Sequence, residues 1–142
     1  MRVDFYILDA GNAAERLHFA CRLTEKAYGL DSRVHAHTSS PADAAKFDEM
    51  LWTFRQGSFI PHEIFAAGTA ARAPVSIGSG NEHPDQGDLL VNLSDEAPAF
   101  AGKFARIAEI IGSDEASRAA GRERFKHYRE LGIEPATHQI GA

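Results

Sequence analysis

The positively charged side chains of this chain gather in one segment near its end. The sequence as a whole is acidic, with 15 Lys and Arg against 20 Asp and Glu and a formal net charge of -5. Residues 116–129 carry +4 and the other residues carry -9, because this segment has one acid, Glu123, and five bases, namely Arg118, Arg122, Arg124, Lys126 and Arg129. Guanidinium groups bind carboxylates in a bidentate manner, so the concentrated charge points to an acidic ligand.

On a helix, most of these bases form a stripe around an aromatic ring. At about 100° per residue, a sector of about 60° contains Arg118, Arg122, Phe125 and Arg129, with Lys126 at its edge. Packing contacts can come from the other sides of the helix, at Ala116, Ala120, His127, Tyr128 and Leu131. Phe125 is therefore free to be exposed, and the stripe suits a short acidic peptide with a hydrophobic end. The alternative is a solvated helix end whose cations complement the helix dipole.

Two large aromatic residues lie outside the expected core. Trp52 points more than about 100° away from the apolar stripe of its helix, which consists of Ala44, Phe47, Met50, Leu51 and Phe54. Phe59 follows in a loop bounded by Gly and Pro. We expect the two rings to share a partly exposed patch that binds another protein, since Trp and Phe side chains are common anchors of interfaces. The alternative is that neighbouring loops cover both rings.

Enzymatic and metal-binding patterns are weak. His35 and His37 alternate on one face of a predicted strand, but no third ligand accompanies them, and an exposed polar face of an edge strand explains them better. The loop GSGNEHPDQG lacks the Gly-Lys-Ser/Thr ending of a phosphate-binding loop, and Ser79 within it lacks the G-x-S-x-G context of a hydrolase nucleophile. We therefore expect no catalytic residue, no metal and no cofactor.

The elements that position these residues follow from hydrophobic periodicity and caps. Strands are expected in the run RVDFYILDAG over residues 2–11 and over residues 32–38, 73–79 and 88–94, the last two joined by a hairpin or crossover loop. A first helix should end at Gly29 in the left-handed conformation, and a second should run from the N-cap Ser40, with Pro41 at its first position, to about Phe54.

The remaining elements lead to the basic helix. Residues 104–111 can be a helix or a buried strand, and we favour the strand. Ser113 is the expected N-cap of the last helix, which Gly132 and Pro135 terminate. This order predicts an α/β fold: a single Rossmann-like three-layer domain over residues 1–134, with a mostly parallel sheet and a C-terminal basic helix, followed by a frayed tail over 135–142.

Composition sets the protein class. A length of 142 residues with 44% hydrophobic content fits one ordinary core. Cys21, the only cysteine, lies in an apolar helical stripe and is expected to be buried. The sequence contains no signal peptide pattern and no apolar run long enough to span a membrane, so we expect a cytoplasmic protein.

Four segments together resemble the DNA polymerase III chi subunit family. They are FYILD near the start, LW followed by SFIPH, the strand APVSIG, and RERFKHYRELG near the end. The resemblance covers nearly the whole chain. It implies a Rossmann-like fold and a non-catalytic subunit of the clamp-loader assembly, which binds the psi subunit on one surface and the acidic C-terminal tail of single-stranded DNA-binding protein on another. DNA would be contacted only indirectly.

The resemblance also implies which residues form the two sites. The tail-binding residues would be Arg118, Arg122, Phe125 and Lys126, with Phe125 standing where the family often has Tyr, so that a hydroxyl hydrogen bond is lost. Trp52 and Phe59 would hold psi, an equivalent partner, or a helicase that competes for the same surface.

A different function for the basic helix is direct binding of single-stranded nucleic acid. Phe125 and Tyr128 would then stack on bases while the arginines contact phosphates. The charge of -9 on the rest of the chain argues against this alternative, because it repels a polyanion at long range.

Overall fold

The computed structural model describes residues 1–65 and 73–141. Along the chain its elements are β1 (Arg2–Leu8), α1 (Ala13–Gly29), β2 (Val34–Thr38), α2 (Pro41–Thr53), β3 (His62–Ile64), β4 (Val75–Ser79), β5 (Gly87–Asn92), a short 3-10 helix (Ala101–Lys103), β6 (Phe104–Ile111), α3 (Glu115–Glu130) and β7 (Ala136–Ile140). The segment 104–111 is thus a strand, as favoured from the sequence.

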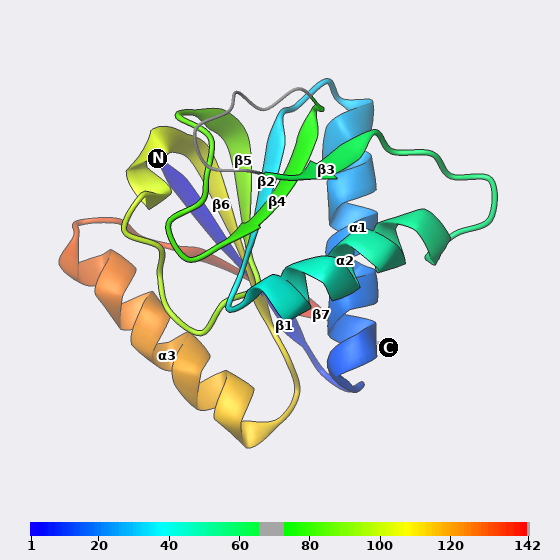
Figure 1. Cartoon of the computed structure of the whole chain (residues 1–142). Helices are drawn as coiled ribbons and strands as arrows, with labels where there is room; N and C mark the ends of the chain where they lie inside the picture. Colours follow the sequence, from blue (N-terminus) through cyan, green and yellow to red (C-terminus); the bar gives the residue numbers. More distant parts are fainter. Residues whose placement is uncertain (66–72, 142) are drawn as a thin grey trace.

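The strands form one seven-stranded sheet in the order β3-β4-β2-β5-β6-β1-β7. All of its pairings are parallel. Helices α1 and α2 lie on one face of the sheet and α3 lies on the other (Figure 1). The predicted Rossmann-like three-layer α/β architecture is therefore confirmed. Since β2 separates β4 from β5, the loop between these two strands is a crossover and not a hairpin.

Two hydrophobic cores fill the two faces of the sheet. Under α1 and α2, side chains such as Cys21, Phe47 and Ile77 form the larger core, and Cys21 is fully buried as expected. On the opposite face, Phe5 and Tyr128 belong to a second core that α3 covers. Strands β1, β5 and β6 contribute to both cores because successive side chains alternate between the faces.

Local capping signals fix the start of each helix. Ser40 accepts a hydrogen bond from the Asp43 amide at 3.1 Å, as the sequence predicts for α2. For α3 the expected N-cap, Ser113, is wrong by one residue. Asp114 caps this helix by accepting from the Ser117 amide, whereas the Ser113 hydroxyl donates to the Gly11 carbonyl in the loop after β1.

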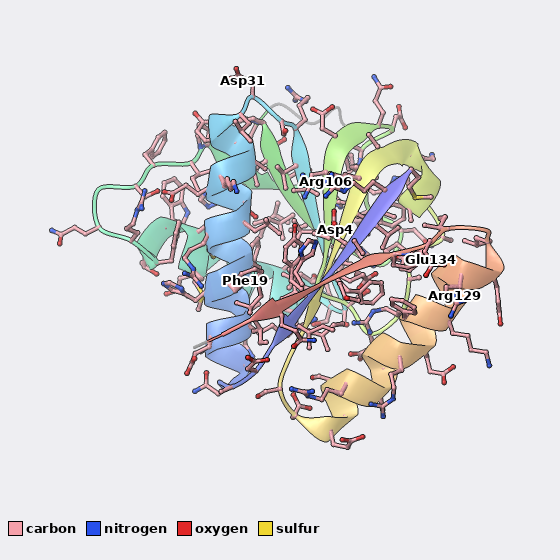
Figure 2. All side chains as sticks on the ribbon, turned by 180° about the vertical axis from the view of Figure 1, so that it is seen from behind. Asp4, Phe19, Asp31, Arg106, Arg129 and Glu134 are labelled. Carbon is pink, nitrogen blue, oxygen red and sulfur yellow. The ribbon has the colours of Figure 1, made fainter. Side chains whose placement is uncertain are left out.

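The helix ends also differ in part from expectation. Gly29 belongs to α1 and is not left-handed. The left-handed residue after this helix is Asp31, with φ of 61° (Figure 2), and Asp tolerates this conformation better than most residues. Gly132 does end α3 in the left-handed region, with φ of 85°.

The expectation of a frayed tail over residues 135–142 is wrong. Ala136–Ile140 form β7, which pairs with β1 in register from Asp4 with Ala136 to Leu8 with Ile140. The His138 ring contacts the buried Asp4 carboxylate at 2.9 Å and stacks on Tyr6 at 4.9 Å. Burial opposes ionisation of Asp4, but the hydrogen bond from His138 and the charge of Arg2 outweigh it and lower the pKa of Asp4. The tail is thus held by a partner far away in sequence.

The expectation of an exposed edge strand for the two histidines is also wrong. His35 and His37 are buried on β2, which lies inside the sheet. Burial lowers the pKa of His35 to about 3, so its ring is neutral and contacts the Ser76 hydroxyl at 2.7 Å. Within the described residues, no group of three or more His, Cys, Asp or Glu is placed to hold a metal ion.

Candidate protein-binding surfaces

Helix α3 is fixed to the sheet by a buried polar network. The Glu109 carboxylate of β6 accepts hydrogen bonds from the Arg124 Nε at 2.8 Å, the Tyr128 hydroxyl at 2.7 Å and the Asn92 amide at 2.9 Å. The Arg124 Nη1 also donates to the Asp95 carbonyl. Burial, together with the charge of Glu109, raises the pKa of Tyr128, so its hydroxyl stays protonated and donates. One of the five bases of this helix is therefore a core residue.

The packing face of α3 differs in part from the predicted one. Tyr128 packs as expected, but the other buried residues of the helix are Gly121 and Arg124, while His127 and Leu131 are exposed. Gly121, Arg124 and Tyr128 follow a three- and four-residue spacing that could have revealed this face. An arginine is rarely buried without a partner, and its partner Glu109 is 15 residues away in sequence.

An apolar cavity of about 170 Å³ lies between α3 and the sheet. Its lining residues are Phe5 and Ile7 of β1, Ile111 of β6, and Arg118, Gly121, Arg122 and Phe125 of α3. At Gly121 helix α3 approaches β6 closely, because a Cβ there would meet the Ile111 Cδ1 at 2.8 Å. Phe125 is half-buried, with its ring 5.2 Å from that of Phe5, so the expected exposure holds only in part.

The cations of α3 surround this cavity and a shallower hollow beside it. Arg118 donates to the carbonyls of Ser113 and Leu8 at 3.2 and 3.3 Å, so its guanidinium is partly engaged by the main chain. Arg122 is 65% exposed and pairs with the exposed Glu115 at 3.0 Å. Lys126 is exposed and lines the hollow together with Arg122, Phe125, Arg129 and Glu130.

The structure thus places all four predicted tail-binding residues on one side of α3. Arg118, Arg122 and Phe125 line the cavity, and Lys126 borders the hollow that shares Arg122 and Phe125 with it. Phe5, Ile7 and Ile111 also line the cavity and were not predicted as site residues. The first two alternate on the strand after residue 2, but nothing in the sequence showed which face of that strand the basic helix covers.

The two predicted partner-binding aromatics also come together. Trp52 of α2 and Phe59 are 52% and 66% exposed, and their ring centroids lie 5.8 Å apart. The Trp52 ring also lies 4.4 Å from the ring of His62, whose nitrogens contact the carbonyls of Ile60 and Asp48 at 2.6 and 3.1 Å. Ile64, at 50% exposed, extends the apolar surface along β3. His62 and Ile64 were not identified from the sequence, although both follow Phe59 closely.

The two surfaces lie on opposite sides of the molecule. Helix α2 and β3 lie at one end of the sheet, and α3 covers the other face (Figure 1). None of the helices within residues 1–65 and 73–141 combines the length and the apolar character that crossing a membrane requires.

The carboxyl edge of the sheet, where Rossmann-like folds commonly bind ligands, is bridged by arginines. Arg16 donates to the carbonyls of Ile110 and Leu93 at 2.9 and 3.4 Å. Arg118 reaches the Leu8 carbonyl at the end of the adjacent β1. Side chains of α1 and α3 therefore form hydrogen bonds with the main chain at the strand ends of this edge.

Comparison with known proteins identifies the family. The protein-family model described as DNA polymerase III chi subunit, HolC, matches residues 1–136 of this chain. The DNA polymerase III subunit chi of Pseudomonas aeruginosa is 40% identical over 139 residues, which cover 98% of this chain and 96% of the relative. The corresponding subunits of Haemophilus influenzae and Escherichia coli are 30% and 26% identical, over 96% and 91% of both chains. The resemblance seen in the sequence is confirmed, and the chain belongs to the DNA polymerase III chi subunit family.

Proposed function

We propose that this replication subunit is a non-catalytic adaptor that links the clamp loader to single-stranded DNA-binding protein. One surface would bind the acidic C-terminal tail of that protein, through Arg118, Arg122, Phe125 and Lys126. The other surface would bind psi, or an equivalent partner, through Trp52 and Phe59, and a helicase could compete for it. DNA would be reached only through the partners.

The observation that carries this proposal is the combination of an apolar cavity with cations at its mouth. A peptide that ends in a hydrophobic residue can bury that side chain against Phe5, Ile111 and Phe125. Its carboxylates then meet Arg122 and Lys126, where bidentate and charge-assisted hydrogen bonds are available. A solvated helix end would not need an apolar cavity beside its cations.

Direct binding of single-stranded nucleic acid is less well supported. That alternative needs Phe125 and Tyr128 as stacking platforms. Tyr128 is buried with its hydroxyl on Glu109, and one of the bases, Arg124, is bonded to the same carboxylate. Without Tyr128 and Arg124, the basic surface of α3 is short for a nucleic-acid strand, and the rest of the chain is acidic.

The second surface supports a protein partner by its composition. An exposed Trp next to an exposed Phe and an exposed Ile is an apolar patch with typical anchor residues. The patch lies beside α2, which contributes Phe47 and Leu51 to the larger core, and beside β3, which pairs with β4.

The test is a calorimetric titration of the chain with the acidic C-terminal peptide of its own single-stranded DNA-binding protein. We expect one-to-one binding that Arg122→Ala weakens by about tenfold or more, as for a charged group at the centre of an interface. Arg55→Ala is the matched control, because Arg55 is equally exposed at 65% and also pairs with a glutamate, Glu25, far from α3.

Each outcome discriminates between functions. Binding of the peptide but not of an oligonucleotide, with loss only in Arg122→Ala, supports the adaptor. Binding of the oligonucleotide with no binding of the peptide at moderate salt would mean that the basic helix serves nucleic acid instead. Equal loss of peptide affinity in Arg122→Ala and Arg55→Ala would show that binding depends on the net charge of the chain and not on a site at α3.

A further inference from the structure

Strand β7 forms an edge of the sheet next to the proposed peptide site. Within the described residues, β1 is the one strand paired with β7, and β7 stands last in the strand order. Figure 2 shows β7 crossing the molecule between α1 and α3, with Arg129 and Glu134 labelled near its start. An edge strand presents main-chain N–H and C=O groups that a further strand can use.

The register identifies which main-chain groups are available. The Ile140 carbonyl accepts from the Asp9 amide at 3.1 Å, so the main-chain groups of Ile140 point towards β1. These groups alternate in direction along a strand, so those of Thr137 and Gln139 point away from β1. The side chains of Thr137 and Gln139 are exposed and lie in register with Phe5 and Ile7, which line the cavity.

The charges around β7 favour an acidic occupant. Ala136–Ile140 contain no carboxylate. Arg2, which is 65% exposed, and His138 both contact Asp4 on one face of the strand, and Arg129, 61% exposed, lies at its start beside Glu134. An acidic segment lying along this edge would meet Arg2 and Arg129 and no negative side chain of the strand itself.

We propose that the acidic peptide whose hydrophobic end fills the cavity continues along β7 as an eighth strand of the sheet. This inference rests on the proposed function and adds the way in which the peptide is held. From the cavity beside β1 to the position of a strand beyond β7 is about two strand spacings of about 4.8 Å, which about three extended residues cover. The residues upstream of these three would then pair with Thr137 and Gln139.

The experiment compares a short and a long peptide on two variants of one residue. The short peptide contains about the last four residues of the acidic tail, and the long one about the last ten, enough to reach and pair with β7. Gln139→Pro removes an outward N–H and leaves the β1–β7 ladder, which proline tolerates at an edge. Gln139→Ala removes the same side chain but keeps the N–H, so it is the matched control.

We expect the wild-type chain to bind the long peptide more tightly than the short one. Gln139→Pro should weaken binding of the long peptide by about three- to tenfold, which corresponds to the loss of one main-chain hydrogen bond. It should leave the affinity for the short peptide unchanged. Gln139→Ala should change neither. N-methylation of alternate upstream residues of the long peptide tests the same hydrogen bonds without changing the protein, and it should weaken binding in one of the two alternating sets only.

The failure of this inference is distinct from that of the proposed function. If the wild-type chain binds both peptides equally, or if neither Gln139→Pro nor N-methylation weakens the long peptide, strand addition is overturned while the peptide site stands. If the wild-type chain binds neither peptide, the proposed function fails and this inference fails with it.

Discussion

Arginine side chains on α3 serve two different purposes. Arg122 is exposed and pairs with Glu115 through a surface contact, which contributes little to stability. Arg124, two residues later, is 5% exposed and pairs with the fully buried Glu109. Removing one partner of a buried ion pair leaves the other charge without compensation, and this cost is much larger than that of a surface pair.

We expect Arg124→Ala to lower the free energy of unfolding by about 3–5 kcal/mol, because the Glu109 carboxylate stays buried with its charge uncompensated. Arg122→Ala should change it by less than about 1 kcal/mol. Denaturant unfolding of the two variants measures both values. Similar stabilities of the two variants would show that Arg124 does not have the structural role assigned to it.

At the scale of elements, the close approach of α3 to β6 depends on a glycine in the middle of a helix. Glycine there costs about 1 kcal/mol relative to alanine in helix propensity. Gly121 is buried, and its Cα faces the Ile111 side chain so closely that a Cβ would come within 2.8 Å of the Ile111 Cδ1. Gly121 and Ile111 both line the apolar cavity, so the position that brings helix and strand together also shapes the proposed site.

Gly121→Ala is therefore expected to weaken binding of the acidic tail peptide. The added methyl group displaces Ile111 into the cavity, and the overpacking cost of about 1–3 kcal/mol is partly offset by better helix propensity. Calorimetry with the peptide and denaturant unfolding separate the two effects. Gly29→Ala in α1, where a Cβ meets no atom within 4 Å, is the control and should leave binding unchanged. Unchanged affinity in Gly121→Ala would remove the cavity from the proposed site.

At the scale of the whole molecule, the sheet separates two surfaces of different chemistry. Trp52 and Phe59 form an apolar surface beside α2, while the α3 surface combines cations with a small apolar cavity. Helices α2 and α3 lie on opposite faces of the sheet (Figure 1). Helix α2, which carries Trp52, packs on the larger core, whereas α3 packs on the second core. The proposed adaptor could therefore hold two partners at once, one on each side of the sheet.

We expect Trp52→Ala to impair association with the psi subunit, or with an equivalent clamp-loader partner, and to leave binding of the acidic tail peptide unchanged. Truncation of an exposed aromatic anchor typically costs about 2 kcal/mol or more in binding. Arg122→Ala should give the reverse pattern. Pull-down of the partner and calorimetry with the peptide measure the two activities, and equal loss of both in either variant would contradict separate surfaces.

Local features of the fold were predictable because their causes lie close together in sequence. The Ser40 cap, the left-handed Gly132 and the exposed Trp52 each follow from neighbouring residues or from helix periodicity. The strand at 104–111 does not follow from local features alone, because a short apolar run fits either a helix or a strand. Its assignment was settled by pairing with β1 and β5, which are distant in sequence.

The sequence by itself therefore determined the α/β class, the basic stripe of α3, the aromatic pair and, by resemblance, the family. Only the tertiary structure decided that residues 136–140 are a strand, that Arg124 is a core residue and that Phe5, Ile7 and Ile111 complete a cavity beside Phe125. The physical reason is the same for all three. Each depends on a partner more than ten residues away, and composition and periodicity carry no information about which distant side chains meet.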